Sequence, residues 1–424
     1  MAGEVAILDR DPEGIAKTRG SVFTLIGFYL PGFKGGGPTR SVANLASALG
    51  SEFNFKVITL DRDYRATTPY PDIPSHKWVA YGHADVMYLK PGWDGLLKLL
   101  GLLRSMERHD VLYLNSFFSR RFSMLPILLK RLCLVRTRCI IVAPRGEFSP
   151  GALQIKKSRK RLYVSIARSL GFYRDVIWHA SSPHEAEHIR GSFERAEKIR
   201  VAGVIPELPH GVGVSQVYLS SEHSERIGNA KHTKKSGQLK ALFISRISPM
   251  KNLVGALSMI RGVSGSVIFH IYGPLEDVAY WEACKSEINS LPANVRVQYL
   301  GEVEHHRVSG IFAEYDLLFL PTLGENYGHV IFEALGAGCP VLISDRTPWR
   351  NLRDVGAGWD LPLGDMQAFH DALQYCIDAD PQSYEDLRRR AKLYAQSHRA
   401  DPEIIAANRS LFREAVATAL MIDR

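Results

Sequence analysis

Two glutamates eight positions apart, Glu325 and Glu333, lie in the stretch of this sequence that carries the most residues able to do chemistry. The stretch 321–340 reads PTLGENYGHVIFEALGAGCP, and it lies between two short and largely apolar runs, 316–320 and 341–343. This pattern predicts a buried parallel strand, a loop, a helix and a second strand. Such a loop lies at the carboxyl edge of a parallel sheet, where open α/β folds bind their ligands.

The loop contains the residue types that would bind a phosphorylated ligand bearing hydroxyl groups. A glycine at the helix start lets a ligand approach the backbone, and the first N–H groups, of Gly328, His329 and Val330, can bind a diphosphate. A carboxylate beside that anion would repel it. We therefore expect Glu325 and Glu333 to accept hydrogen bonds from the hydroxyl groups of a sugar and a ribose. Together these groups indicate a nucleotide sugar.

A plainer interpretation is that Glu325 only favours the helix dipole and that Glu333 is a solvated helix residue. Against it stand the joint occurrence of the spacing, the glycine, the flanking strands and the closing Gly-Cys-Pro at 338–340. These features resemble the Glu-x7-Glu signature of retaining glycosyltransferases of family 4. The resemblance implies the GT-B fold, an α/β architecture of two Rossmann-like doubly wound domains facing a central cleft.

The resemblance also assigns roles to residues outside this stretch. Arg246 and Lys251, five positions apart after the predicted strand 239–245, match the Arg/Lys pair of the family and would neutralise a diphosphate. With Glu325 they make up the expected catalytic set. The expected substrate-binding residues are Gly35, Gly36, Gly37, Asn115, Arg145, Glu147, Gly273, Val303, Asn326, Tyr327, Gly328, His329, Val330 and Glu333.

The first half of the chain supplies the weaker signals. The glycine run 35–37 follows the predicted strand 22–29; it is either a flexible turn or, as in family 4, a loop over the donor phosphates. Arg145 and Glu147 lie where an acceptor would enter, after the predicted strand 139–143. Relatives commonly place a histidine near the position of Asn115, and this sequence has none there.

Two backbone positions in the second half are expected to contact the nucleobase. Gly273 ends the predicted strand 266–272, and Val303 follows Gly301 after the predicted strand 294–300. Relatives read the base through the main chain at this point, which leaves little trace in the side chains. The sequence therefore does not separate uracil from guanine, and the expected donor is a UDP- or GDP-sugar.

Composition bounds the class of protein. The chain has 424 residues, about two or three domains, with a formal net charge of +9. This basic excess suits phosphorylated substrates or an anionic membrane surface, and no nucleic acid is expected. The five cysteines lack zinc spacing and are expected to be buried free thiols in a reducing cytosol. Neither a signal peptide nor an apolar run of ~18 residues is present in the sequence.

The expected domain organisation has five segments. They are a polar N-terminal tail (1–20), an acceptor-side Rossmann-like domain (21–209), a linker (210–238), a nucleotide-sugar-binding Rossmann-like domain (239–395), and a C-terminal helix (396–424) that packs back on the N-terminal domain. The linker is rich in Ser, Gly, His and Lys and poor in large apolar residues.

The function that the resemblance implies is transfer of a hexosyl group, with retention, to a hydroxyl of a saccharide acceptor. The expected acceptor is lipid-linked, in bacterial surface polysaccharide synthesis, and the expected location is cytoplasmic. Basic residues at 130–138 and 156–168, and the leucine-rich helix 95–108, are either ordinary solvated helix faces or a surface that docks on the anionic inner face of the cell membrane. Two alternatives are an epimerase of the same fold, in which water replaces the acceptor, and a non-catalytic nucleotide-sugar-binding protein.

A first prediction concerns metal. Asp61-Arg62-Asp63 follows a predicted strand and has the form of a metal–diphosphate clamp, but without supporting context we interpret it as a polar loop. Glycosyl transfer should therefore persist in a chelator, and Asp61→Asn should be nearly silent. Activity that the chelator abolishes, and that Mn²⁺ or Mg²⁺ restores, would contradict this interpretation.

Overall fold

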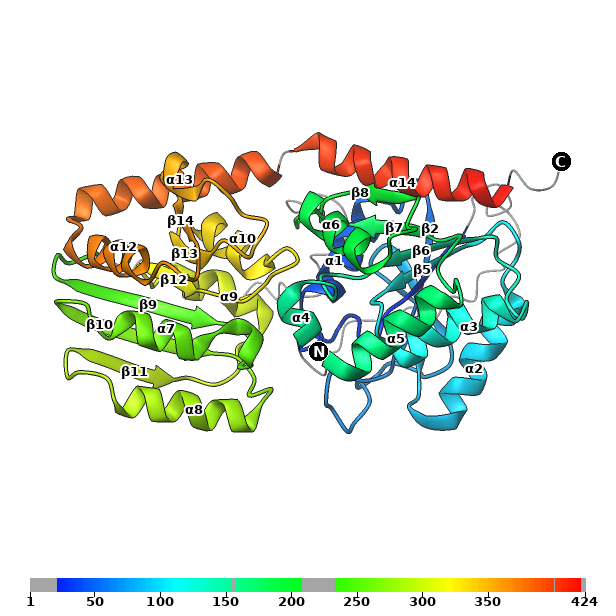
Figure 1. The fold of residues 1–424 in the computed structure, drawn as a ribbon, viewed down its shortest axis with the longest axis horizontal. Coiled ribbons are helices and arrows are strands. Elements are labelled where there is room, and N and C mark those ends of the chain that lie inside the picture. The colour runs from blue at the N-terminus through cyan, green and yellow to red at the C-terminus, as the bar shows by residue number, and fades with distance from the viewer. Residues whose placement is uncertain (1–20, 155–156, 208–232, 400, 421–424) are drawn as a thin grey trace. The chain divides into compact units, whose positions relative to one another are not determined.

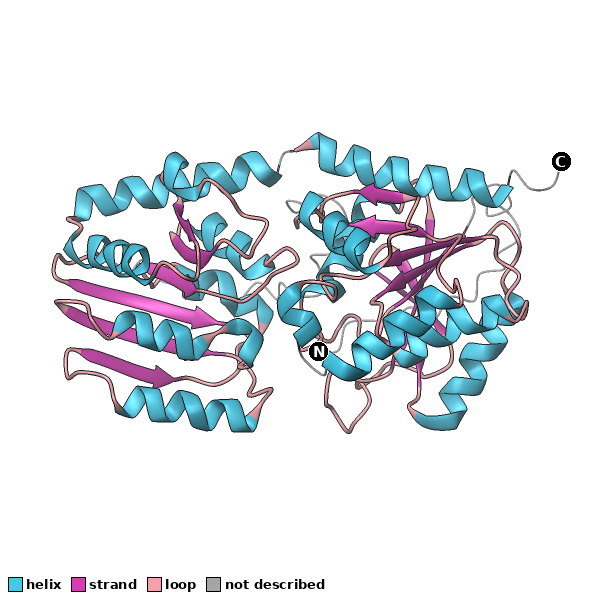
Figure 2. Cartoon of the chain, viewed as in Figure 1, coloured by secondary structure: helices cyan, strands magenta, loops and turns pink. Residues whose placement is uncertain are grey.

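The computed structural model describes residues 21–154, 157–207, 233–399 and 401–420, and the chain divides into two compact units (Figure 1). The described part of the first unit ends at residue 207 and resumes with the C-terminal helix, whereas 233–399 belong to the second unit. The predicted tail (1–20) and most of the predicted linker (210–232) lie outside the described residues. Strands and helices alternate along both units (Figure 2).

The described part of the first unit contains an eight-stranded sheet in the order β3-β4-β2-β1-β5-β6-β7-β8. All neighbours are parallel except β3 and β4, an antiparallel hairpin that the sequence analysis does not predict. The strands are β1 (Ser21–Leu25), β2 (Asn54–Leu60), β3 (Trp78–Tyr81), β4 (Ala84–Leu89), β5 (Val111–Asn115), β6 (Cys139–Ala143), β7 (Ile177–Ala180) and β8 (Ile199–Val201).

Helices cover both faces of this sheet. The helices α1 (Gly37–Leu49) and α14 (Pro402–Leu420) share one core with it. The opposite face packs against α2 (Gly92–Ser105), α3 (Leu125–Arg131), α5 (Lys157–Ser169) and α6 (Pro183–Ser192). Two short elements, the π-helical turn η2 (Arg120–Met124) and α4 (Pro150–Gln154), complete the unit.

Strand β5 shows why the sequence folds this way. Its residues alternate between the two cores: Val111 and Tyr113 face the side of α1 and α14, while Leu112 and Leu114 face the other side. All four are fully buried. A strand buried on both faces requires a continuous apolar run rather than an alternating one, and residues 111–114 form such a run.

Helix α14 completes the first core from the far end of the chain. The Phe412 ring lies 5.6 Å from that of Phe55 and 5.3 Å from that of Tyr113. A bidentate ion pair joins Arg200 on β8 to Glu414, with both N–O distances 2.7 Å. The predicted helix 396–424 is therefore two elements, since residues up to Arg399 belong to α13 (Pro381–Arg399) of the second unit.

The described part of the second unit has a six-stranded parallel sheet in the order β11-β10-β9-β12-β13-β14. Its strands are β9 (Gln238–Ile244), β10 (Ser266–Tyr272), β11 (Val295–Tyr299), β12 (Leu317–Leu320), β13 (Val341–Ser344) and β14 (Gly358–Leu361). Besides α13 its helices are η3 (Pro249–Lys251), α7 (Leu253–Ile260), α8 (Val278–Asn289), α9 (His305–Phe312), α10 (His329–Ala337), α11 (Leu352–Val355) and α12 (Met366–Asp378).

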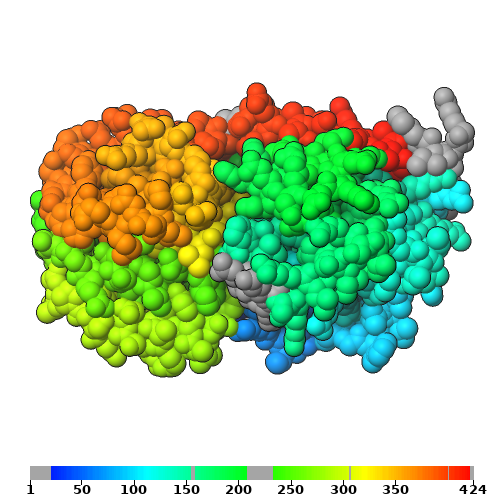
Figure 3. All heavy atoms as spheres, in the orientation of Figure 1, coloured from blue at the N-terminus to red at the C-terminus, as the bar shows by residue number. Residues whose placement is uncertain are grey.

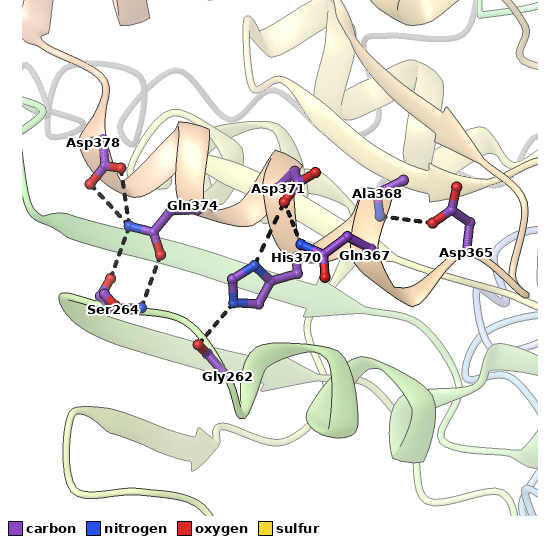
Figure 4. Close-up of polar contacts among 9 residues, drawn as sticks. All are labelled: Gly262, Ser264, Asp365, Gln367, Ala368, His370, Asp371, Gln374 and Asp378. Atoms are coloured by element: carbon purple, nitrogen blue, oxygen red, sulfur yellow. Dashed lines mark hydrogen bonds and ion pairs between the residues drawn. The ribbon is translucent and has the colours of Figure 1, made fainter.

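Polar side chains of α12 hold the turn between α7 and β10 (Figure 4). The His370 Nε2 donates to the carbonyl of Gly262 at 2.8 Å. The Gln374 amide accepts from the N–H of Ser264 at 2.9 Å and donates to its carbonyl at 3.3 Å. Asp365 caps the helix through the N–H of Ala368 at 3.0 Å. These contacts give the residues a structural role.

Two expectations from composition can be compared with the structure. Cys139, Cys284, Cys339 and Cys376 are buried free thiols, but Cys133 is exposed, so the expectation of burial is wrong for it. Cys133 follows the end of α3 in a left-handed conformation, outside the packed strands. None of the described helices has the length and apolar character needed to cross a bilayer.

The packing of α14 generates a stability prediction. Phe412→Ala should destabilise the first unit by about 3–5 kcal/mol, because it empties a fully buried aromatic site. Thermal or denaturant unfolding measures this loss. Leu420→Ala, at a position 58% exposed on the same helix, is the control and should change stability little. Equal effects of the two substitutions would contradict the packing described.

Candidate functional site

The sheet of the second unit has its switch point between β9 and β12. The chain passes from β9 to β10 on one side and from β12 to β13 on the other. Strands β9 and β12 pair in parallel, with Leu318 beside Leu242. The loops that follow them therefore meet at one edge, which is where open α/β sheets bind ligands.

Three hydrogen bonds join these two loops. The carbonyl of Met250 accepts from the N–H of Leu323 at 2.8 Å and from the Thr322 hydroxyl at 3.0 Å. The Asn252 amide donates to the carbonyl of Pro321 at 2.9 Å. Residues more than 60 positions apart in the chain thereby hold one another in place.

The same loops bring two predicted catalytic residues together. The Lys251 Nζ donates to Glu325 Oε1, and the two side chains are only 11% and 13% exposed. The N–H of Glu325 donates to the carbonyl of Arg346 at 2.9 Å, which fixes the backbone from which the carboxylate projects. The sequence predicts Lys251 and Glu325 as separate ligands of a donor, whereas the structure joins them as a nearly buried ion pair.

Arg246, the third predicted catalytic residue, follows β9 at the same edge. Its guanidinium is 40% exposed and forms an ion pair with Glu276, with an N–O distance of 3.0 Å. Sequence reasoning does not find Glu276, because nothing local marks an acid 30 positions later as a partner. The N–H of Ile247 donates to the carbonyl of Pro274 at 2.9 Å, so the turn of Arg246 lies against the loop after β10.

Gly273, a predicted nucleobase contact, has a structural role in this loop. Its φ is +128°, and a Cβ at this position would lie 1.9 Å from the carbonyl oxygen of Ser245. Its N–H donates to the carbonyl of Gly301 at 2.8 Å. Val303, two positions after Gly301, is partly buried and packs against the core. The structure thus places both residues at the carboxyl edge and explains Gly273 by close packing.

The start of α10 lies at the other side of this edge. Gly328 precedes the helix with φ +79°, and a Cβ there would lie 2.8 Å from Ile331 Cδ1. The Trp349 indole donates to the carbonyl of Tyr327, and its ring stacks on Phe332 at 5.9 Å. Burial raises the pKa of Tyr327. The predicted residues Asn326, His329, Val330 and Glu333 lie in this loop and in the first two turns of the helix, all of them partly buried.

In the first unit the predicted glycine loop is held by an acid. Gly36 precedes α1 and Gly37 begins it, while Gly35 lies in the loop before. The Asp63 carboxylate accepts from the N–H groups of Phe33 at 2.9 Å and Lys34 at 3.1 Å.

The Asp61-Arg62-Asp63 sequence therefore serves structure at a strand end. Asp61 is 2% exposed and accepts from the Ser75 hydroxyl and from the Arg62 Nε, both at 2.9 Å. Asp61→Asn should lower stability, in contrast to the silent substitution expected from the sequence. Among the described residues no group of three or more His, Cys, Asp or Glu side chains is placed to hold a metal.

Arg145 and Asn115 meet at the carboxyl ends of β6 and β5. The Asn115 Oδ1 accepts from the Arg145 Nη2 at 2.9 Å and from its Nε at 3.2 Å. The same Nη2 donates to the Tyr113 hydroxyl at 2.6 Å, and that hydroxyl bonds to His179 Nδ1 at 2.9 Å. Sequence reasoning missed Tyr113 and His179, and the only signal was a histidine inside an apolar strand.

The carboxylate of Glu147, which is predicted to bind substrate, accepts hydrogen bonds from other residues of the protein. Its oxygens accept from the Ser116 hydroxyl at 2.8 Å and from the N–H groups of Phe117 and Phe118. Burial raises the pKa of Glu147, and these hydrogen bonds oppose that rise. Glu185, which the sequence analysis does not name, accepts in the same way from the N–H of Gly146 and from Ser181. Both acids hold the loop around Arg145.

The described architecture is that of known GT-B glycosyltransferases. Sucrose-phosphate synthase from Thermosynechococcus elongatus superposes with a TM-score of 0.66, at 14% identity, covering 94% of this chain and all of that one. The Anabaena protein HepE in complex with UDP-glucose gives 0.62 at 15% identity, covering 94% and 99%. At these identities the likeness establishes the fold of two Rossmann-like domains.

Two comparisons of sequence give matches, and the family match lies within the second unit. Residues 225–396 match the family described as glycosyl transferases group 1. A phosphatidyl-myo-inositol mannosyltransferase of Mycobacterium leprae is 29% identical over 175 residues, which is 39% of this chain. The match spans 42% of that relative's length. Both matches are to glycosyltransferases, and each covers less than half of this chain.

The nearly buried ion pair generates a prediction by double-mutant cycle. Lys251→Met alone should lose about 3 kcal/mol or more of stability, because it leaves the Glu325 carboxylate without its cation. Lys251→Met combined with Glu325→Gln should recover a large part of that loss. Denaturant unfolding of the two single variants and the double variant measures the coupling. Simple additivity would mean that the two side chains do not interact.

Proposed function

We propose that this protein is a retaining glycosyltransferase of the family 4 type, which transfers a hexosyl group from a UDP- or GDP-sugar to a saccharide hydroxyl. The observation that carries the proposal is the convergence at the β9/β12 switch point of Lys251, Glu325, Arg246 and the start of α10. Two cations and a helix start suit a diphosphate. HepE, similar in fold, was solved with UDP-glucose.

In the proposed reaction the protein stabilises the leaving diphosphate. Arg246, Lys251 and the N–H groups at the start of α10 carry the charge that develops as the bond from the anomeric carbon to the phosphate oxygen breaks. The acceptor oxygen bonds to the same face of that carbon, and its proton passes to the departing phosphate. Glu325 holds Lys251 and accepts from donor-sugar hydroxyls, and Glu333 accepts from the ribose. No metal takes part.

The experiment that tests this proposal uses a panel of nucleotide sugars. The donor should raise the melting temperature of the protein, because a ligand that binds only the folded state stabilises it. The same donor should then be consumed in the presence of saccharide acceptors. Consumption without transfer, giving an epimerised sugar and free nucleotide, would instead indicate an epimerase. Binding without any turnover would indicate a non-catalytic binding protein.

A substitution at the clamp sharpens the test. Arg246→Ala should lower turnover with saturating donor by ~10²-fold, on the scale of one lost charge-stabilising donor. Arg261→Ala is the matched control, because Arg261 also pairs with an acid of the same unit, Glu287, at 2.7 Å. Initial rates measure both. Wild-type rates in the Arg246 variant would contradict the role of this arginine.

We further propose that the acceptor is lipid-linked and that the first unit docks on the cytoplasmic leaflet. The similar mycobacterial protein is named for an inositol phospholipid. In the first unit Leu162, Ile166 and Leu170 are 63%, 44% and 62% exposed, and their spacing of four places them on one face. Exposed Arg159 and Arg161 accompany them. Atoms of this unit on the face toward the viewer are drawn in Figure 3.

Two lysines of the basic surface predicted from the sequence donate hydrogen bonds to backbone carbonyls. The Lys160 Nζ donates to the carbonyl of Ala152 at 2.7 Å, and the Lys130 Nζ donates to the carbonyl of Thr137. Both ammonium groups are therefore engaged with the protein rather than fully available to lipid. Lys156 lies outside the described residues. The proposed docking surface consists of Leu162 and Ile166 on α5, Leu170 directly after it, and the arginines Arg159 and Arg161.

Co-sedimentation with anionic liposomes tests the docking surface. The protein should bind at low salt and release at high salt, since each basic residue near the surface contributes about 1 kcal/mol at most. Leu162→Ser combined with Ile166→Ser should weaken binding severalfold. Leu393→Ser on α13, at a position 52% exposed in the second unit, is the control. Absence of binding at low salt would contradict membrane docking.

A further inference from the structure

Arg145 is a cation whose hydrogen bonds, among the described residues, all go to neutral oxygens. Its Nε and Nη2 donate to the Asn115 amide and the Tyr113 hydroxyl, and it forms no ion pair within the described chain. Its side chain is only partly exposed. A guanidinium removed in part from water is normally matched by an anion. The positive charge of Arg145 is therefore not balanced by an acid among the described residues.

A buried relay fixes the orientation of this guanidinium. The carbonyl of Ala202 can only accept, so His179 Nε2 donates to it at 2.9 Å and His179 Nδ1 accepts. The Tyr113 hydroxyl must then donate to Nδ1 and accept from Arg145. This arrangement requires a neutral imidazole, and burial, aided by Arg145, lowers the pKa of His179 to about 3. Arg145 is thus held by groups that do not ionise near pH 7.

The donors that remain at this point have no hydrogen-bond partner among the described residues. The Asn115 side chain is 3% exposed, yet its Nδ2 has no hydrogen-bond partner among the described residues. Arg145 Nη1 likewise makes no hydrogen bond within the described chain. A buried amide donor left unpaired costs free energy, which a ligand oxygen would recover. Both remaining groups are donors, so they select a ligand that offers only acceptor oxygens.

The neighbouring acids do not supply those oxygens. Glu147 accepts from Ser116, Phe117 and Phe118, and Glu185 accepts from Gly146 and Ser181. Their oxygens are engaged by the backbone and hydroxyl groups of nearby loops. They therefore hold the loop that carries Arg145, and the left-handed backbone of Arg145, with φ +56°, is kept in place by these bonds.

We propose that Arg145 and Asn115 bind an oxyanion, a carboxylate or a phosphate group, carried by the acceptor saccharide. The assignment of the ligand as an acceptor rests on the proposed glycosyltransferase function, whereas the binding of the anion does not. Arg145 contributes a charged pair of donors and Asn115 a single buried donor, and an oxyanion accepts from both. The acceptor is therefore an acidic saccharide.

Three soluble probes of similar shape test the proposal: methyl glucoside, methyl glucuronide and glucose 6-phosphate. Their dissociation constants, measured by ligand-observed NMR on the intact protein, should be lower for at least one acidic probe than for the neutral one. Arg145→Gln should weaken the acidic probe at least about tenfold and leave the neutral probe unchanged. Arg174→Gln, at an exposed arginine of the same unit, removes the same charge and should have no effect.

A second variant guards against loss of folding in Arg145→Gln. Asn115→Asp keeps the shape and the oxygen that Arg145 contacts, but it replaces the buried donor by an acceptor and neutralises the arginine. It should also abolish binding of the acidic probe. Preference for glucuronide or for phosphate supports the proposal and identifies the anion. Equal binding of acidic and neutral probes, binding of neither acid, or loss in Arg174→Gln would overturn it.

The same proteins separate this proposal from the proposed function. Donor binding, measured as the shift in melting temperature with nucleotide sugar, should be unchanged in Arg145→Gln. A wild-type protein that binds the acidic probe but no nucleotide sugar would support the anion site and contradict the glycosyltransferase. The reverse result would keep the glycosyltransferase and overturn the anion site.

Discussion

The ion pair between Lys251 and Glu325 is the interaction on which the second unit's candidate site depends. Two charges that are mostly removed from water are tolerated only when each is paired and hydrogen-bonded, and here each is supplied by a different loop. The sheet order makes the pair feasible, because β9 and β12 are neighbours. The bonds of Met250 with Leu323 and Thr322 then fix the loops so that the pair forms in one geometry.

The first unit uses its acids differently at the equivalent edge of its sheet. Asp63, Glu147 and Glu185 each accept from backbone N–H groups of a neighbouring loop. Carboxylates at these positions replace the hydrogen bonds that irregular backbone would otherwise lose on burial. Arg145, at this edge, consequently has only neutral partners among the described residues, whereas in the second unit acids neutralise both Arg246 and Lys251.

Sequence patterns predict this fold because parallel strands buried on both faces leave an unmistakable apolar run, as in β5 and β6. They also predict which residues follow each strand, and hence Glu325, Lys251 and Arg145 as edge residues. They do not state which strands are neighbours, so the pairing of Lys251 with Glu325 and of Arg246 with Glu276 could not be read from the chain. The role of His179 could not be predicted for the same reason, since its hydrogen-bond partners come from β5 and from the residue after β8.

Helix α14 belongs to the first unit although the second unit precedes it in the sequence. Its Phe412 completes the core around Phe55 and Tyr113, and the ring of Tyr113 belongs to the relay that orients Arg145. These residues are separated by the whole of the second unit in sequence. Closing so long a loop costs chain entropy, which the contacts of α14 with the first core must offset. The first unit's core, and with it the setting of Arg145, is therefore complete only once the last helix has been made.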